Sequence, residues 1–298
     1  MSEPTASLPQ GDGPEPLAAV LAALELEQTE TDTFVGTSLP QLHGRVYGGQ
    51  VLAQSLLAAG RTVADARLPH SVHGYFLRPG ALDEPITFAV ERLRDGRSFS
   101  ARRTHALQSG VPILSMITSF QEEQEGLEHA DEMPDVPDPE SLPSSVELFN
   151  SLDHPVAQFF YRNGAFDLRH TAGNLFTGPV AEQTDRQCLW MRSRAPIPGD
   201  QLRQRAMLTY ACDQVMLEPI MRRHGLSWMT REASVASLDH AMWWHRDVDA
   251  GEWLLYVQSS PSARGGRGLG TAKVFSRGGE LVASIAQEGM LRVPRSGV

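Results

Sequence analysis

Three polar residues in the second half of the chain have side chains that could together activate a water molecule. They are Asp213, Ser237 and Gln287, and each lies beside a stretch of apolar residues. An ionised carboxylate takes a proton from water when the two lie within hydrogen-bond reach. A hydroxyl and a carboxamide carry both donors and acceptors, so they can hold that water in line. The set predicts general-base chemistry, provided that the fold brings the three side chains together.

An internal repeat singles out the same positions. Gln121 follows Ser71 at the same interval at which Gln287 follows Ser237, and each interval contains a predicted strand, a Gly/Asp-rich turn and a hairpin. A repeat of this kind indicates that one supersecondary unit occurs twice. We therefore expect a duplicated domain, with Ser71 and Gln121 as the first-copy counterparts of Ser237 and Gln287.

Each copy is expected to contain one short helix that is apolar nearly all round and is therefore buried. In the second copy this helix is predicted over residues 213–225. Asp213 suits its N-cap, where the side chain accepts from free backbone N–H groups and the helix dipole favours the ionised carboxylate. Gly225 suits the left-handed residue that closes the helix, and Pro219 predicts a kink inside it.

The helix of the first copy is predicted over residues 48–60. The place of Asp213 is thus taken by Gly48 or Gly49, neither of which has a carboxylate. We therefore expect the chemistry in the second copy only.

Composition and charge exclude several classes of protein. With 298 residues, 41% hydrophobic and 21% charged, the chain resembles a soluble globular protein with room for about two domains. Its formal net charge of −10 argues against binding to nucleic acid or to an anionic membrane. No apolar run is long enough to span a membrane, and the first residues do not form a signal sequence. We therefore expect a cytoplasmic protein without stable membrane association.

The two cysteines, Cys188 and Cys212, lack the spacing of metal ligands and lie among apolar residues. This context predicts buried free thiols in a reducing compartment. We expect no metal and no cofactor.

Four segments are expected in chain order. They are a disordered N-terminal arm over residues 1–15, a first domain over 16–121, an acidic, proline-rich linker over 122–155 and a second domain over 156–293. Residues 122–144 contain no basic residue and few large apolar ones, so they cannot bury enough surface to order themselves as a core element.

Hydrophobic periodicity and turn residues predict the remaining elements. Helices are expected near 17–26 and from Asp200 into the Asp213 region, and strands near 32–39, 71–77, 86–93, 99–108, 113–120, 166–169, 187–194, 233–244, 253–259, 268–276 and 281–288. Each copy is one buried helix followed by an antiparallel meander. The predicted fold class is α+β, with two tandem copies of a curled antiparallel sheet wrapped around a buried helix.

Several segments, in the right order over roughly residues 17–293, resemble the acyl-CoA thioesterase II (TesB-type) family. They are Arg45-Val46-Tyr47-Gly48-Gly49-Gln50-Val51, His73-Gly74-Tyr75-Phe76-Leu77-Arg78-Pro79-Gly80, Asp95-Gly96-Arg97-Ser98-Phe99-Ser100-Ala101-Arg102-Arg103, Ser237-Leu238-Asp239-His240-Ala241-Met242-Trp243 and Gln287-Glu288-Gly289. The resemblance implies a double hot-dog fold and hydrolysis of acyl-CoA to free acid and CoA. It also implies that Asp213, Ser237 and Gln287 form the catalytic set, with serine at the position where the family has threonine or serine.

The resemblance leaves two mechanisms open for a thioester. Asp213 either activates water as a general base or attacks the carbonyl itself to give an anhydride. Backbone N–H groups of Gly48 and Gly49 are expected to form the oxyanion hole, although a tight turn would explain these glycines equally well. Arg264 and Arg267 would either bind CoA phosphates or lie in a solvated turn. Hot-dog sheets usually pack into larger bodies, so we also expect a homo-oligomer, either a dimer or a tetramer.

Other functions fit the residues less well. A serine hydrolase would need Gly-x-Ser-x-Gly, which the sequence lacks. A hot-dog hydratase or dehydratase and a non-catalytic acyl-CoA-binding protein stay as alternatives. Asp239, His240 and His245 could form an acid–base group, but strand alternation places Asp239 and His240 on opposite faces. We interpret these three residues as structural.

Overall fold

The computed structural model describes residues 15–64, 67–230 and 233–293, so the predicted N-terminal arm lies almost entirely outside it. The first half contains α1 (Pro16–Leu24), β1 (Glu27–Glu30), β2 (Thr33–Gly36), α2 (Gly48–Gly60), β3 (Arg67–Phe76), β4 (Ile86–Asp95), β5 (Phe99–Gln108) and β6 (Val111–Glu122). The second half contains α3 (Ser145–Ser151), α4 (Pro155–Asn163), β7 (Phe166–His170), β8 (Arg186–Ser193), α5 (Gln201–Cys212), α6 (Glu218–Arg223), β9 (Ser234–Ser237), β10 (Asp239–Trp244), β11 (Leu254–Arg264), β12 (Arg267–Ser276) and β13 (Leu281–Arg292). Most predicted strands are confirmed within a few residues.

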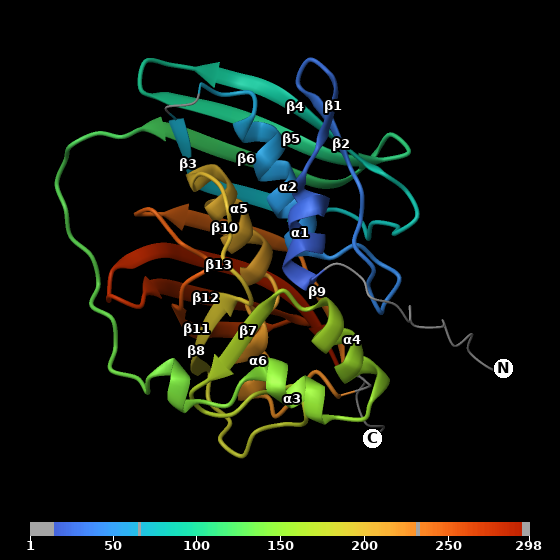
Figure 1. Cartoon of the computed structure of the whole chain (residues 1–298), viewed down its shortest axis with the longest axis vertical. Coiled ribbons are helices and arrows are strands. Elements are labelled where there is room, and N and C mark those ends of the chain that lie inside the picture. Colours follow the sequence, from blue (N-terminus) through green and yellow to red (C-terminus); the bar gives the residue numbers. More distant parts are fainter. Residues whose placement is uncertain (1–14, 65–66, 231–232, 294–298) are drawn as a thin grey trace.

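The strands form one antiparallel sheet in the order β1-β2-β4-β5-β6-β3-β10-β13-β12-β11-β8-β7, with β9 paired to β13. The halves join in the middle of this order, where β3 and β10 pair with Tyr75 opposite Asp239 and Ser71 opposite Trp243. In each half the sheet curls around one helix, α2 or α5, and a meander follows that helix (Figure 1). The predicted α+β fold with two curled sheets is confirmed.

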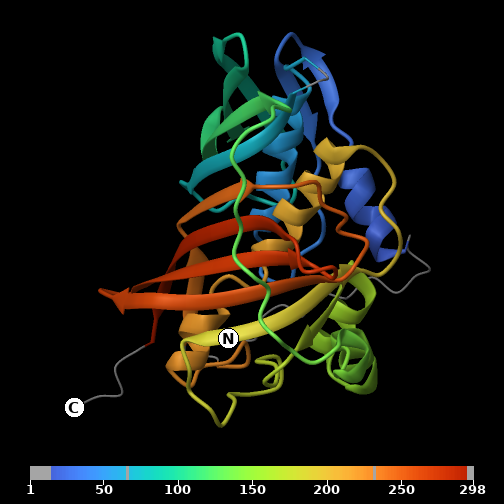
Figure 2. The same cartoon turned by 90° about the vertical axis from the view of Figure 1, so that its left-hand side faces the viewer.

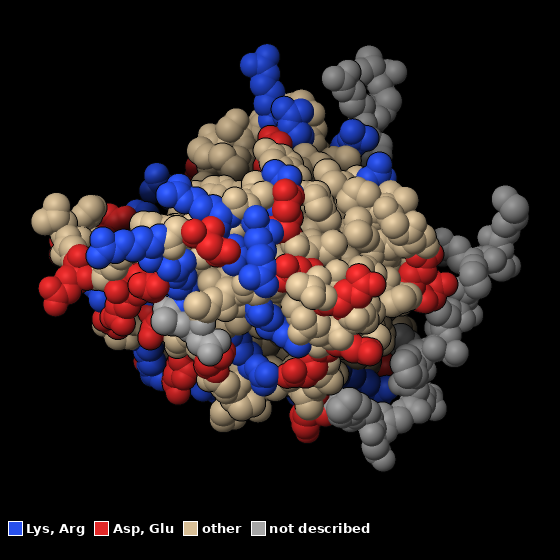
Figure 3. All heavy atoms as spheres, turned by 90° about the horizontal axis from the view of Figure 1, so that it is seen from above, with Lys and Arg blue, Asp and Glu red and all other residues tan. Residues whose placement is uncertain are grey.

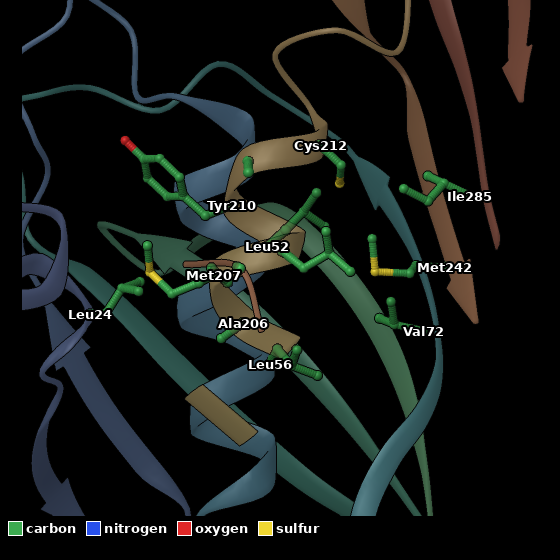
Figure 4. Packing of buried hydrophobic residues seen from close by; sticks show 14 of the residues in the cluster. Leu24, Leu52, Leu56, Val72, Ala206, Met207, Tyr210, Cys212, Met242 and Ile285 are labelled. Carbon is green, nitrogen blue, oxygen red and sulfur yellow. The ribbon is translucent and has the colours of Figure 1, made fainter. Parts of the chain in front are cut away.

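The two central helices pack against each other and give both halves a common core. Leu52 and Leu56 of α2 and Met207 of α5 are fully buried, and Val72 and Met242 close the same cluster from β3 and β10 (Figure 4). A helix that is apolar nearly all round is stable only when every face is covered. Here the sheet covers one side of each helix and the other helix covers the opposite side.

The helix predicted over 213–225 is wrong. Helix α5 ends at Cys212, so Asp213 is a C-cap, and α6 begins at Glu218 after an intervening turn. A helix through this region would set the Pro219 ring against the carbonyl of Val215. Pro219 instead lies in the first turn of α6, where proline costs little. The predicted left-handed Gly225 is confirmed by its φ of 63°.

The first-copy counterparts chosen from the repeat are also wrong. Gln121 follows the fully buried Phe120 in β6, so alternation directs it to the outer face of the sheet, unlike the buried Gln287. Ser71 is directed outward in the same way, because it precedes the fully buried Val72. The equal intervals therefore do not mark equivalent positions.

The predicted linker packs against the sheet from Met133 onward, whereas residues 123–132 are exposed. After residue 122 the chain crosses the outer face of the second half of the sheet (Figure 2). Along this segment Met133, Val136 and Leu142 contact the cluster around Trp190 and Trp253. Both indoles donate to this segment, to the Pro137 carbonyl and to the Glu140 carboxylate, each at 3.0 Å. The segment contains too few apolar residues to order itself, and the aromatic face of the sheet orders it instead.

Charged side chains of both signs are intermixed over the face shown in Figure 3. This pattern fits the net charge of −10 and offers no broad basic surface on that face. Among the helices that the structure describes, none combines the length and the apolar character needed to cross a bilayer.

Candidate active site

The three residues selected from the sequence lie in direct contact. Ser237 Oγ donates to Asp213 Oδ1 at 2.9 Å, and Gln287 Nε2 donates to the same oxygen at 2.9 Å. Gln287 Nε2 also lies 2.8 Å from Ser237 Oγ, which accepts from it. The carboxylate comes from the end of α5, the hydroxyl from the last residue of β9 and the amide from β13. The geometry forms a closed triangle of hydrogen bonds on one carboxylate oxygen.

Glycines in the sheet allow the turn after Asp213 to lie flat against β12 and β13. A methyl group at Gly270 would overlap the Met216 carbonyl, and one at Gly289 would overlap the Leu217 side chain. Gln258 Nε2 also donates to the Val215 carbonyl at 3.1 Å. The turn is therefore held by close backbone approach, which only glycine permits at these places.

A buried polar network anchors α6 on the far side of the turn. The Glu218 carboxylate is fully buried and accepts from His170 at 2.8 Å, Gln187 at 2.7 Å and Trp228 at 2.9 Å. Burial by itself would raise the pKa of Glu218, but the charge of His170 and the three donors outweigh it and hold the pKa below the usual value. Arg222 adds a further donor to Gln187 at 3.1 Å.

The second carboxylate oxygen of Asp213 faces the start of α2. A methyl group at Gly48 would lie 2.7 Å from Oδ2. Tyr47 Oη donates to the Tyr210 carbonyl at 2.7 Å and so ties the start of α2 to the last turn of α5. In the described part of the chain, the N–H groups of Gly48 and Gly49 donate no backbone hydrogen bond. These donors and the positive end of the α2 dipole therefore lie beside Asp213.

This arrangement corrects the electrostatic argument made from the sequence. Asp213 lies at the C-terminal end of its own helix, where the dipole opposes a negative charge. Two donors, from Ser237 and Gln287, reach its Oδ1, and its Oδ2 faces the N-terminus of α2, which belongs to the other half. Gly48 thus lies across the junction from Asp213, and Gly49 lies against the Tyr210 carbonyl of α5. The C-cap of α2, which corresponds to Asp213 at the end of α5, is Arg61.

His240 belongs to the same network, although the sequence analysis assigned it a structural role. Its ring is 1% exposed, Nδ1 lies 2.6 Å from Gln287 Oε1 and Nε2 lies 3.5 Å from Cys212 Sγ. Burial lowers its pKa, against the opposing effects of the Gln287 hydrogen bond and the Asp213 charge. The predicted alternation is confirmed, since Asp239 turns the other way and accepts from the Glu288 N–H at 2.8 Å. The sequence contained one signal for this role of His240: strand alternation directs its side chain inward, on the strand that follows Ser237.

Other predicted residues lie outside this network. His245 bonds Ser284 Oγ at 2.9 Å. Arg264 and Arg267 face each other across the β11–β12 hairpin, where Arg267 pairs with Glu288 at 3.0 Å. The pairing of Gly270 with Gln287 places this hairpin at the same end of the sheet as the site. A role in binding CoA stays a prediction.

The thiols and the potential metal ligands do not suggest a further reactive centre. Both cysteines are free, and burial raises the pKa of each, which keeps the thiols protonated. Within residues 15–64, 67–230 and 233–293, no three His, Cys, Asp or Glu side chains gather as a metal site would require.

A surface cavity of about 540 Å³ lies elsewhere, against β7 and β8. Its arginines, Arg169, Arg192 and Arg194, are balanced by acidic residues of the same lining. Asp213, Ser237 and Gln287 are not part of it.

Two curled sheets fused edge to edge around paired helices, with a carboxylate–hydroxyl–amide cluster at their junction, define a double hot-dog protein. A conserved protein of unknown function with a hot dog fold from Alicyclobacillus acidocaldarius has the same architecture, with a TM-score of 0.76 at 20% identity over 93% of this chain and 98% of that one.

Family comparisons identify the lineage within this class. The model of the acyl-CoA thioesterase family matches residues 148–290, and that of the acyl-CoA thioesterase N-terminal domain matches residues 37–121. Acyl-CoA thioesterase 2 of Haemophilus influenzae is 34% identical over 90% of this chain and 95% of its own length. The crystal structure of acyl-CoA thioesterase II TesB2 from Mycobacterium marinum is 40% identical, with a TM-score of 0.77 over 93% of this chain and 100% of that one. The chain belongs to the acyl-CoA thioesterase family, a family of enzymes.

Proposed function

We propose that the protein hydrolyses the thioester of fatty acyl-CoA to a free acid and CoA, with Asp213 as the general base. The observation that carries the proposal is the asymmetry of the Asp213 carboxylate. Its Oδ1 is occupied by Ser237 and Gln287, whereas Oδ2 faces the start of α2. Its relatives named acyl-CoA thioesterases support the choice of substrate class.

The hydrogen bonds assign separate tasks to the three side chains. Both amide hydrogens of Gln287 and the hydroxyl hydrogen of Ser237 are engaged within the triangle. These two residues therefore orient the carboxylate, while Oδ2 accepts the proton of the attacking water. The new C–O bond forms as the carbonyl oxygen gains charge, the C–S bond then breaks, and Asp213 returns the proton to the leaving sulfur.

The start of α2 stabilises the charge that develops on the carbonyl oxygen. The free N–H groups of Gly48 and Gly49 point from a helix N-terminus, which is a favourable place for an anion. Donors that are already fixed beside the reacting carbonyl cost no reorganisation when the charge forms. The two halves thus contribute different groups to one reaction: the base comes from α5 and the oxyanion donors come from α2.

The anhydride route remains the alternative for the same site, because Oδ2 could itself attack the carbonyl carbon. A single turnover in ¹⁸O-labelled water tests one form of the anhydride route. General-base catalysis places the label in the acid product of the first turnover. If Asp213 attacks and water then opens the anhydride at the carboxyl carbon of Asp213, the first product is unlabelled and the label enters Asp213. If water opens the anhydride at the acyl carbon, the product is labelled as in the general-base route, and trapping of the anhydride with hydroxylamine reveals it.

The proposal is tested by measuring CoA release from a series of acyl-CoA substrates with a thiol reagent. The Asp213→Asn variant keeps the size of the side chain but cannot accept the proton, so we expect kcat to fall by about 10²- to 10⁴-fold. Asp239→Asn is the matched control, because Asp239 is another carboxylate near the site, two residues from Ser237, and it accepts from the Glu288 N–H. Thermal unfolding of each variant checks that the fold is intact.

Each other outcome of this experiment replaces the proposal with a specific alternative. Dehydration or hydration of the acyl chain without CoA release indicates a lyase. Binding of acyl-CoA without turnover indicates a non-catalytic binding protein. The expected homo-oligomer and cytoplasmic location are further proposals, which light scattering and cell fractionation would test.

A further inference from the structure

The Gln287 side chain can adopt two orientations that differ by exchange of its amide nitrogen and oxygen, and only one of them serves the site. In that orientation Nε2 donates to Asp213 Oδ1 and to Ser237 Oγ. In the flipped orientation the amide oxygen would lie against a carboxylate oxygen at hydrogen-bond distance, where both atoms can only accept. The triangle around Asp213 then loses two of its three bonds.

His240 contacts the opposite end of that amide. Its Nδ1 lies 2.6 Å from Gln287 Oε1, and because an amide oxygen only accepts, this nitrogen must carry the hydrogen. Both side chains are at most 1% exposed, so no water competes for this bond. A donor at this position favours the same orientation of the amide as the carboxylate does from the other side.

The far side of the imidazole offers no acceptor strong enough to draw the hydrogen to Nε2. Nε2 lies 3.5 Å from Cys212 Sγ, and burial raises the pKa of that thiol so that it keeps its hydrogen. Burial also lowers the pKa of His240, so the ring is neutral and only one nitrogen carries a hydrogen. The hydrogen of that thiol goes to the Thr209 carbonyl at 3.3 Å, so the sulfur offers an Nε2–H only a weak acceptor, whereas the Gln287 amide oxygen is a strong acceptor for an Nδ1–H.

We propose that His240 is a positioning residue, which holds the Gln287 amide in the orientation that orients the Asp213 carboxylate. His240 does not contact Asp213 directly; it contacts Gln287, which contacts Asp213, and it acts only through Gln287. The inference rests on the proposed function, because the orientation matters for the rate only if Asp213 is the base. A purely structural histidine would not require a donor at this particular ring atom.

Two substitutions of similar polarity separate the donor from the bulk of the ring. In His240→Asn the side-chain nitrogen can take the place of Nδ1, so the donor to Gln287 is kept. In His240→Gln the longer side chain places its amide near the position of Nε2, so that donor is lost. We expect kcat to stay within about threefold of wild type in H240N and to fall by about 10- to 100-fold in H240Q, as for outer-shell partners that orient metal ligands. KM should change little in either variant.

A double-mutant cycle with Gln287→Ala decides whether His240 acts through the amide. Once the amide is absent, H240Q should change the remaining kcat by less than about twofold, because the partner through which it acts is gone. Equal losses from H240Q with and without Gln287, or wild-type kcat in H240Q, would overturn the inference. Wild-type enzyme and Asp213→Asn are assayed alongside, since absent CoA release by the wild type would instead refute the proposed function.

A measurement on the wild-type protein keeps the inference testable if a variant does not fold. Nitrogen NMR of protein labelled in its 10 histidines reports which ring nitrogen carries the hydrogen, and H240N identifies the His240 signals by difference. If H240N does not fold, H240Q identifies the His240 signals by the same difference. Hydrogen on Nδ1 supports the inference, and a stable Nε2–H tautomer of His240 refutes it.

Discussion

Replacing Gly48 with alanine should separate catalysis from stability more cleanly than any other change at the junction. The added methyl group would lie 2.7 Å from Asp213 Oδ2 and 3.0 Å from the Phe76 ring. An ordinary contact begins near 3.4 Å, so the carboxylate must move by roughly 0.7 Å. That shift strains the bonds to Ser237 and Gln287, and the methyl group occupies the space where the attacking water must bind.

The expected effect on the rate is large, and the effect on stability is small. A misplacement of about 1 Å can cost about 100-fold in rate, so we expect kcat to fall by about two orders of magnitude. Alanine at this position improves helix propensity by about 1 kcal/mol, which offsets part of an overpacking cost of about 1–3 kcal/mol. The free energy of unfolding should therefore change by less than about 2 kcal/mol.

The assay combines CoA release under saturating substrate with urea unfolding of the same preparation. Gly178→Ala is the control, because a methyl group there meets no atom within 4 Å. Wild-type kcat in Gly48→Ala would refute the reasoning, since it would show that neither Oδ2 nor the start of α2 takes part in the reaction. Loss of activity together with unfolding would show instead that the junction cannot accept the methyl group.

Two further predictions concern the groups that support the site. Glu218→Gln removes the charge from a fully buried network and should lower the free energy of unfolding by about 3 kcal/mol near neutral pH. The folded state holds the pKa of Glu218 below its usual 4.5, so this stabilisation is present above that pH and is lost as the pH falls through the lower folded pKa. The difference in free energy of unfolding between wild type and variant, measured in urea melts, should therefore shrink on acidification. A difference that stays constant with pH would contradict this account. Trp253→Ala should lower the free energy of unfolding by about 3–5 kcal/mol and expose residues 122–138 to proteolysis, because the fully buried indole holds that segment on the sheet. Substitution of the fully exposed Leu127 is the control and should change neither the free energy of unfolding nor the rate of proteolysis.

The sequence was sufficient for those features that depend on neighbours along the chain. Period-two alternation and Asp-Gly or Ser-Gly turns located the strands, and the predicted bounds of β5 agree with the observed ones. The apolar stretch from Gly48 to Gly60 forms α2 as expected, and Asp200 caps α5. These signals are local, so a single sequence contains them in full.

Predictions that treated a segment in isolation failed where a distant element decides its structure. The break after α5 depends on Pro219 and on the glycines of β12 and β13, which admit the turn. The acidic segment after β6 is ordered by the aromatic face formed by Trp190 and Trp253, which lie far along the chain from it.

For the candidate site, the internal repeat and the resemblance to the TesB-type family selected Asp213, Ser237 and Gln287, and the residue types agreed with general-base chemistry. Only the tertiary structure decided that the helix start beside this carboxylate is that of α2, and that His240 completes the network. Each of these contacts joins segments that are remote in sequence, and their distances are set by the packing of α2 on α5 and by the register of the strands. Local sequence patterns do not encode that packing. The direction of each hydrogen-bond donor in the site is therefore known only from the structure in which the two halves are joined.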